Sequence, residues 1–143
     1  MEKMIWLDMD GTFVDLYGVK DWLPMLINED VTPYVVAKPL FNMSQLARLL
    51  NKAQRNGYGL GVISWTSKSG TPTYNVKVAA AKHGWLAQHL HSVKFDRVDI
   101  VPYGTPKQNG RRGYLFDDEA PNRSNWEGTA YEPCDLIGFL KTL

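Results

Sequence analysis

The sequence predicts an α/β fold in which a parallel β-sheet carries helices on both faces. Four short apolar runs are spread along the 143 residues, and segments with helical periodicity separate them. Alternating strands and helices build a parallel sheet, because each crossover helix returns the chain to the end where the next strand must begin. The length suits one hydrophobic core and is too short for a second full domain, so we expect a single domain over residues 1–143.

The expected strands are short apolar runs, which is typical of strands buried on both faces. They cover residues 4–7, 60–65 and 113–116, and a weaker run covers 98–101. Ligands bind at the carboxyl ends of the strands in such a sheet. The residues that follow each run are therefore the candidates for chemistry.

Three segments have the apolar spacing of helices that pack on a sheet. Residues 43–53 form the first, and an Asn-Gly pair just beyond them supplies a stop. Residues 73–85 form the second, in which three consecutive alanines allow close packing. Pro133, which a first helical turn tolerates, precedes the third helix, expected over 134–143.

Residues 13–39 are less regular than the rest of the chain. We expect a short flap or a helical hairpin close to the end of the first strand, because the segment is too short for a large independent cap. Its aromatic residues either shape a pocket or pack against the core. The predicted architecture therefore has little or no cap.

The composition excludes several classes of function. A net charge of +1 with 22% charged residues does not suggest coating of nucleic acid or a polybasic membrane anchor, so an anionic partner must be recognised locally. The single cysteine, Cys134, excludes an internal disulfide and a multi-cysteine metal site, and we expect a packed thiol. No apolar run reaches membrane-spanning length and no signal-peptide pattern begins the chain, so we expect a soluble, cytoplasmic protein without a membrane partner.

Two carboxylates, Asp8 and Asp10, follow the first predicted strand and are one residue apart. Residues two apart on an extended chain point the same way, so these side chains emerge together. Two carboxylates at the end of a buried strand repel each other and are costly to desolvate. A bound cation is the natural compensation.

Chemically useful side chains also follow the other three strands. Thr66 and Ser67 follow the second, Lys107 the third, and Asp117 and Asp118 the fourth. Carboxylates, water and phosphate are the ligands that Mg²⁺ usually takes. Lys107 offers a point charge to a phosphoryl oxygen, and Thr66 or Ser67 with nearby backbone N–H groups can donate hydrogen bonds. Together these groups suit phosphoryl transfer.

A division of labour between the first two aspartates follows from the chemistry of such a transfer. An aspartate can attack phosphorus and form an aspartyl-phosphate that water later hydrolyses, and we assign this role to Asp8. Asp10 would protonate the leaving oxygen and afterwards deprotonate the attacking water.

The segment Asp8-Met9-Asp10-Gly11-Thr12 resembles the first motif of the haloacid dehalogenase (HAD) superfamily. In that motif the first aspartate is nucleophile and metal ligand, and the second is general acid/base. Three further matches occur in the right order. They are residues 63–67 for the second motif, Lys107 for the third and residues 115–118 for the fourth.

The resemblance implies a three-layer, Rossmann-like fold and a magnesium-dependent phosphomonoester hydrolase that acts through an aspartyl-phosphate. It implies Mg²⁺ ligands from Asp8, the backbone carbonyl of Asp10, Asp117 and Asp118, with the direct ligand among the last two left open. Thr66 is the expected phosphate ligand of the second motif, and Ser64 takes that place if the strand ends earlier.

Within the superfamily, the paired aspartates and the hydroxyl pair are most similar to deoxyribonucleotidases and to the 3'-phosphatase domains of polynucleotide end-healing enzymes. This similarity implies a nucleotide or a nucleic-acid phosphate end as substrate. The polynucleotide phosphatases carry an arginine just after the second motif, where this chain has Lys68. An open site also fits a substrate enclosed with help from a partner subunit, so an oligomer is compatible with this interpretation.

Two alternatives of other classes stand beside the hydrolase. One is a non-catalytic phosphoryl-binding or scaffold module of the same fold, and the other is a phosphotransferase with an acceptor other than water. For the remaining polar and aromatic residues we expect structural roles. These are a solvated basic loop at Arg111 and Arg112, core or pocket-wall positions for Trp65 and Trp126, and surface or packing positions for His83, His89 and His91.

Overall fold

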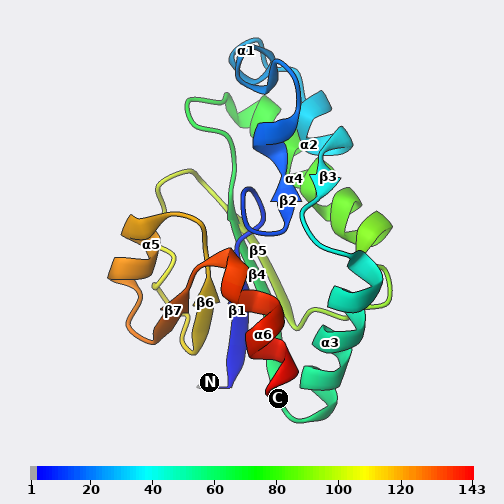
Figure 1. The fold of residues 1–143 in the computed structure, drawn as a ribbon. Coiled ribbons are helices and arrows are strands. Elements are labelled where there is room, and N and C mark those ends of the chain that lie inside the picture. Colours follow the sequence, from blue (N-terminus) through cyan, green and yellow to red (C-terminus); the bar gives the residue numbers. More distant parts are fainter. Residues whose placement is uncertain (1–2) are drawn as a thin grey trace.

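A five-stranded parallel sheet forms the centre of the protein in the computed structural model, which describes residues 3–143 (Figure 1). The strand order is β5-β4-β1-β6-β7, and every neighbouring pair is parallel. The strands are β1 (Met4–Leu7), β4 (Gly59–Trp65), β5 (Arg97–Val101), β6 (Tyr114–Phe116) and β7 (Thr129–Tyr131). The four predicted strands are confirmed to within one residue at each end, and β7 is an additional strand at the edge.

The central position of β1 determines where the site can form. Leu7, the last residue of β1, pairs with Val62 of β4 on one side and with Phe116 of β6 on the other. The chain therefore leaves β1 between two strands whose connections run to opposite edges of the sheet. Such a topological switch point is where open α/β sheets bind ligands.

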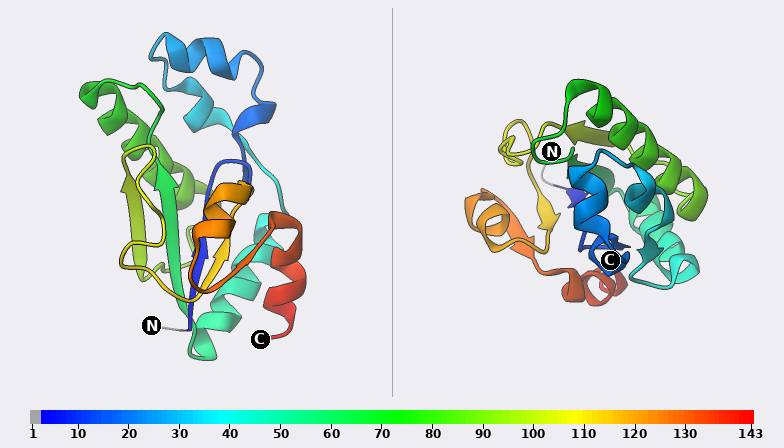
Figure 2. Two further views of the ribbon diagram at one scale, coloured as in Figure 1. Left: turned by 90° about the vertical axis from the view of Figure 1, so that its left-hand side faces the viewer. Right: turned by 90° about the horizontal axis from the view of Figure 1, so that it is seen from above.

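Helices cover both faces of the sheet, as predicted (Figure 2). One face packs against α3 (Met43–Arg55), α4 (Pro72–His89) and α6 (Leu136–Lys141), which enclose the largest apolar cluster. The short helix α5 (Ala120–Asn125) lies on the opposite side of the sheet from α3 and α4. On that second face the core is smaller and contains Met4, Trp6, Ile63, Leu115 and Trp126.

The ends of the helices follow from their capping residues. Asn42 caps α3, where its side chain accepts a hydrogen bond from the Gln45 N–H at 2.9 Å. The α4 helix begins after Thr71 and passes through Gly84 without interruption, so it is longer at both ends than the pattern predicted.

The C-terminal segment begins as a single 3₁₀ turn, Pro133–Asp135, and Cys134 on that turn is exposed. The expectation of a packed thiol is therefore wrong.

The segment between β2 (Val14–Asp15) and β3 (Lys38–Pro39) forms a flap over the carboxyl ends of the strands (Figures 1 and 2). These two strands pair antiparallel and form its stem. Between them lie the 3₁₀ turn η1 (Leu16–Gly18) and the helices α1 (Trp22–Ile27) and α2 (Thr32–Val36). We use the term flap for residues 14–39.

The flap is fixed to the N-terminal half of α4. Leu16 and Tyr34 of the flap pack with Tyr74 and Val78 of α4 in a separate buried cluster. The Tyr74 hydroxyl also donates a hydrogen bond to the Asp30 carbonyl at 2.9 Å. These contacts hold the flap beside the ends of β1 and β4.

Across residues 3–143, no helix combines the length and apolarity needed to cross a membrane.

Candidate active site

Asp8 lies directly after β1, where it is buried and surrounded by hydrogen-bond donors. Its backbone N–H extends the sheet by donating to the Phe116 carbonyl at 3.0 Å. One carboxylate oxygen accepts from the Thr12 hydroxyl at 3.0 Å, and the other accepts from Lys107 Nζ at 2.9 Å. The side chain is 9% exposed, and these two partners orient its carboxylate.

The loop after Asp8 turns tightly around a single carbonyl group. The Met9 carbonyl accepts hydrogen bonds from the N–H groups of Thr12, Phe13 and Val14 at 3.0–3.1 Å. Gly11 within this turn has a φ of 82°, and a Cβ there would overlap the carboxylate of Asp118. Both constraints require glycine, which explains why an Asp-Gly-Thr sequence follows the strand.

Three carboxylates from two strand ends meet at this point. Oxygen atoms of Asp8, Asp117 and Asp118 lie within 4.8 Å of one another. Burial and the charge of Asp8 raise the pKa of Asp117 to about 6 and the pKa of Asp118 to about 8. A cation bound among these carboxylates would offset their burial and mutual repulsion, and the all-oxygen donor set suits Mg²⁺.

The two adjacent aspartates after β6 differ in their surroundings. Asp117 is fully buried and accepts hydrogen bonds from Lys107 Nζ at 2.7 Å, the Glu119 N–H at 2.9 Å and Asn122 Nδ2 at 3.2 Å. Asp118 is partly exposed, borders the cavity and approaches Gly11. The sequence predicted both residues here, and Asn122 is an additional partner.

Lys107 connects the ends of two strands. Its ammonium group is 3% exposed and bridges Asp8 and Asp117. Burial alone would lower the pKa of Lys107, but the two carboxylates raise it above the usual lysine value. The lysine is therefore charged, and together with Asp8 it lines the cavity described below.

Arg111 holds the loop that carries Lys107. Its guanidinium group donates to the carbonyls of Lys107 at 3.2 Å and Asn109 at 3.1 Å, and to the Asp99 carboxylate at 2.9 Å. The side chain is 7% exposed, so the expectation of a solvated arginine is wrong for Arg111. Arg112 is 69% exposed and is solvated as predicted. The reason is local: Asp99 on β5 gives Arg111 a carboxylate partner within the fold.

Asp10 is held by Lys82, a residue that the sequence interpretation missed. Lys82 Nζ donates to Asp10 Oδ2 at 2.8 Å, the Ser64 hydroxyl at 2.6 Å and the Trp65 carbonyl at 2.7 Å. Burial raises the pKa of Asp10, while the charge of Lys82 lowers it. The sequence contained an indication of this role. Lys82 is four residues after Val78 and three before Trp85, so it lies on the buried face of α4. A lysine on such a face needs an acidic partner.

The loop after β4 carries the predicted hydroxyl groups. Ser64 is still within the strand, and its hydroxyl accepts from Lys82, whereas Thr66 follows the end of β4. The backbone N–H groups expected to serve as donors already have partners: that of Thr66 donates to the Val101 carbonyl, and that of Ser67 to Asn75 Oδ1. Lys68 and Ser69 follow in the same loop and also line the cavity, so their N–H groups stay candidate donors together with the Thr66 and Ser67 hydroxyl groups.

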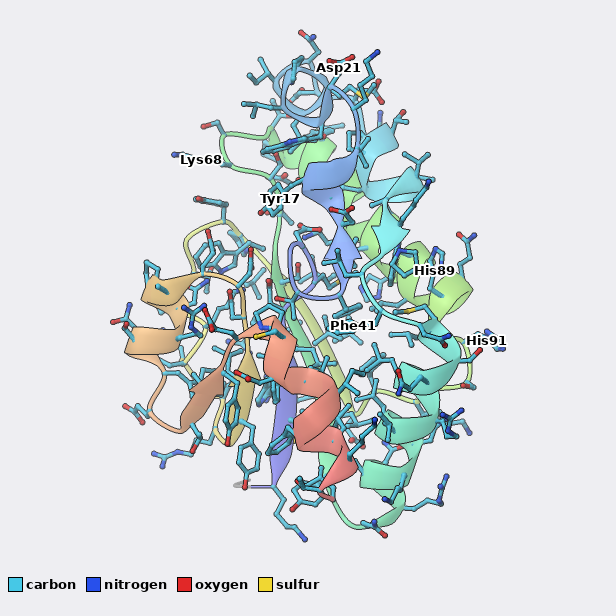
Figure 3. All side chains as sticks on the ribbon, in the orientation of Figure 1. Tyr17, Asp21, Phe41, Lys68, His89 and His91 are labelled. Atoms are coloured by element: carbon cyan, nitrogen blue, oxygen red, sulfur yellow. The ribbon has the colours of Figure 1, made fainter. Side chains whose placement is uncertain are left out.

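These groups line one cavity of about 420 Å³ between the sheet edge and the flap. Its polar base contains Asp8, Asp10, Ser64, Thr66, Ser67, Lys107 and Asp118, and its walls are mainly apolar. Asp117 lies behind this base. Trp65 is part of the wall, whereas Trp126 is buried on the other face and donates to the Gly113 carbonyl. Figure 3 shows Tyr17 and Lys68 at the flap end of the molecule, and His89 and His91 away from it.

Comparison with solved structures supports the fold. The chain is similar to a D,D-heptose 1,7-bisphosphate phosphatase from Burkholderia thailandensis, with a TM-score of 0.59 over 97% of this chain and 96% of that one. The sequence identity is 12%, so the likeness concerns the fold. No protein-family model and no curated protein matches the sequence. The three-layer α/β fold with a parallel sheet that the sequence predicted is confirmed.

Proposed function

We propose that this protein is a magnesium-dependent phosphomonoester hydrolase that acts through an aspartyl-phosphate on Asp8. The observation that carries the proposal is the buried Lys107, which joins Asp8 and Asp117 beside a third carboxylate, Asp118. Burying charged groups is costly unless they are paired. This arrangement leaves one side of Asp8 facing a cavity large enough for a substrate.

Mg²⁺ would be held by Asp8, Asp118 and the backbone carbonyl of Asp10. Asp117 already accepts three hydrogen bonds, so we assign it to orienting Lys107 and assign direct binding to Asp118. Bound there, the cation would neutralise charge on Asp8 and on the phosphoryl oxygens.

The reaction would proceed in two steps. In the first, Asp8 attacks phosphorus, the bond to the leaving oxygen breaks, and Asp10 gives that oxygen a proton. In the second, Asp10 takes a proton from water, which attacks phosphorus, releases phosphate and restores Asp8. The burial that raises the pKa of Asp10 favours its protonated form, and Lys82 fixes its position.

The phosphoryl oxygens would be held by Lys107 and by the hydroxyl groups of Thr66 and Ser67. Ser64 is the weaker candidate, because its hydroxyl accepts from Lys82 and lies within β4. Charge neutralisation and positioning of this kind supply most of the catalysis in phosphoryl transfer.

A nucleotide or a nucleic-acid phosphate end is the substrate we propose on the resemblance of the first and second motifs. The structural neighbour is named for a sugar bisphosphate, which makes a sugar phosphate the competing substrate class. Product analysis with an added alcohol separates hydrolysis from transfer to another acceptor.

The experiment that tests the proposal is phosphate release with Mg²⁺ and with EDTA, for the wild type and for Asp8→Asn. Asp21→Asn is the matched control, because Asp21 lies at the outer part of the flap and its φ of 61° suits asparagine (Figure 3). We expect release that needs Mg²⁺, is abolished by Asp8→Asn and is unchanged by Asp21→Asn. Absence of release from aryl phosphates, nucleotides, sugar phosphates and 3'-phosphorylated oligonucleotides would contradict the proposal.

A further inference from the structure

The cavity changes character with distance from the carboxylates. Its base is polar, and most of the other lining residues are aromatic or aliphatic, with Glu29, Lys68, Ser69 and Glu119 as the polar exceptions. The flap contributes Tyr17, Trp22, Leu23 and Ile27, the end of β4 contributes Trp65, and the loop after β5 contributes Tyr103. A substrate phosphate at Asp8 would therefore direct its leaving group between these two apolar walls.

Several of these wall residues are large and apolar, yet much of their surface is exposed to solvent. Leu23 is 50% exposed and Ile27 is 71% exposed, and both line the cavity. Tyr17 and Tyr103 are each 48% exposed. A contiguous apolar surface of this kind is costly in water and commonly marks a binding site. Here it continues into the carboxylate cluster, so the substrate itself is the fitting occupant.

Two polar groups of the wall already have protein partners. Trp65 donates its ring N–H to the Thr105 carbonyl at 2.8 Å, and its ring lies 4.9 Å from that of Tyr103. Glu29, at the rim, already accepts from the N–H and the hydroxyl of Thr71. Because aromatic and aliphatic side chains predominate in the wall, the face of an aromatic ring gains more apolar contact there than a leaving group rich in hydroxyls.

We propose that the substrate is a phosphomonoester whose leaving group carries an aromatic ring. This inference rests on the proposed function. The ring binds between the α1 side of the flap and the pair formed by Trp65 and Tyr103. A phenyl ring and a nucleobase share this chemistry, and the two can be told apart by the choice of substrate.

The test compares two matched pairs of substrates with Mg²⁺ present. The first pair is 2-phenylethyl phosphate and ethyl phosphate, which both release a primary alcohol and so differ in the ring rather than in leaving-group acidity. The second is adenosine 5'-monophosphate and ribose 5-phosphate. We expect kcat/KM to be about tenfold or more higher for the ring-bearing member of each pair, since burying on the order of 60 Å² of apolar surface gives this factor. A preference in the second pair alone identifies the nucleobase as the ring.

Substitutions in the cavity wall test whether Leu23 and Ile27 cause the preference for ring-bearing substrates. We expect the double substitution Leu23→Ala and Ile27→Ala to lower kcat/KM for the ring-bearing substrates about tenfold and to leave ethyl phosphate nearly unchanged. The control is the double substitution Val35→Ala and Val36→Ala, because these residues are 51% and 54% exposed on the same flap and lie outside the cavity lining. We expect the control to change neither substrate pair.

Binding of non-hydrolysable analogues separates this inference from the proposed function. We expect 3-phenylpropylphosphonate to bind about tenfold more tightly than propylphosphonate in calorimetry, whether or not turnover is observed. Phosphate release without any preference for rings would overturn the inference and leave the hydrolase intact. A ring preference in binding without release from any substrate would support the inference and overturn the hydrolase. Equal binding of the two phosphonates would overturn the inference.

Discussion

Replacing Lys82 by methionine removes one charge and three hydrogen bonds from the interior. The Lys82 ammonium group is 2% exposed and donates to Asp10, Ser64 and the Trp65 carbonyl, at 2.6–2.8 Å. Methionine has a similar length, so the change opens little space but removes the donor from three acceptors, of which the Ser64 hydroxyl is buried and the other two are partly buried. Asp10 is the partner most affected, because its carboxylate depends on Lys82 for its orientation.

The expected loss in the free energy of unfolding is ~3 kcal/mol, toward the lower end for a broken buried ion pair. The lower end applies because the Asp10 side chain retains 16% exposure and can accept a proton. The expected loss in kcat is about 100-fold, because a general acid that is no longer aligned loses most of its contribution. KM should change less, since Lys82 does not border the leaving group.

The assay combines urea unfolding with steady-state kinetics in two backgrounds, wild type and Asp10→Asn. If Lys82 acts through Asp10, Lys82→Met lowers kcat in the wild type and causes no further loss in the Asp10→Asn background. Lys77→Met is the control, because Lys77 is exposed on the same helix and should affect neither measurement. An equal loss of kcat in both backgrounds would refute the reasoning, since Lys82 would then act independently of Asp10.

Three further predictions concern the rest of the site. Gly11→Ala forces a Cβ into a backbone with a φ of 82° and against the Asp118 carboxylate, so we expect a loss of at least about 2 kcal/mol in urea unfolding and weaker Mg²⁺ binding in calorimetry. Arg111→Met frees the loop of Lys107 and should lower kcat/KM roughly tenfold, whereas Arg112→Met, at a 69% exposed position, should be neutral in the same assay. Because the pKa of Asp118 is raised to about 8, protons compete with Mg²⁺, and calorimetry should show an affinity that rises with pH until about 8. Without Mg²⁺, the folded protein keeps the Asp118 proton up to a pH of about 8, whereas the unfolded chain releases it at a lower pH. The free energy of unfolding should therefore fall as the pH rises toward about 8. A free energy of unfolding in urea that rises over this range would contradict the raised pKa of Asp118.

Much of the fold could be predicted because its central strands are continuous apolar runs. Residues 4–7 and 60–65 match β1 and β4 closely, since both strands are buried on both faces. The edge strand β7, Thr129–Tyr131, could not be found in this way, because it has three residues and is half exposed. The α5 helix, Ala120–Asn125, lacks an apolar face and buries no residue, so no periodicity marks it.

The residues of the candidate site likewise fall into those that the sequence predicted and those that it did not. The predicted residues follow strand ends, and the parallel sheet brings them to one edge, where six of them line the cavity and Asp117 lies just behind it. Lys82 and Arg111 were missed because they come from a helix and a loop, and only the tertiary structure pairs them with Asp10 and Asp99. A strand-end rule finds the groups that would meet substrate, but not those that hold them.

The central claim is that Asp8 is the nucleophile, and a crystal structure with Mg²⁺ and beryllofluoride tests it most directly. Beryllofluoride mimics a phosphoryl group on a carboxylate. We predict density for it joined to an Asp8 carboxylate oxygen, within hydrogen-bond distance of Lys107 and the Thr66 hydroxyl. Beryllofluoride joined to Asp10, or bound away from both aspartates, would contradict the account.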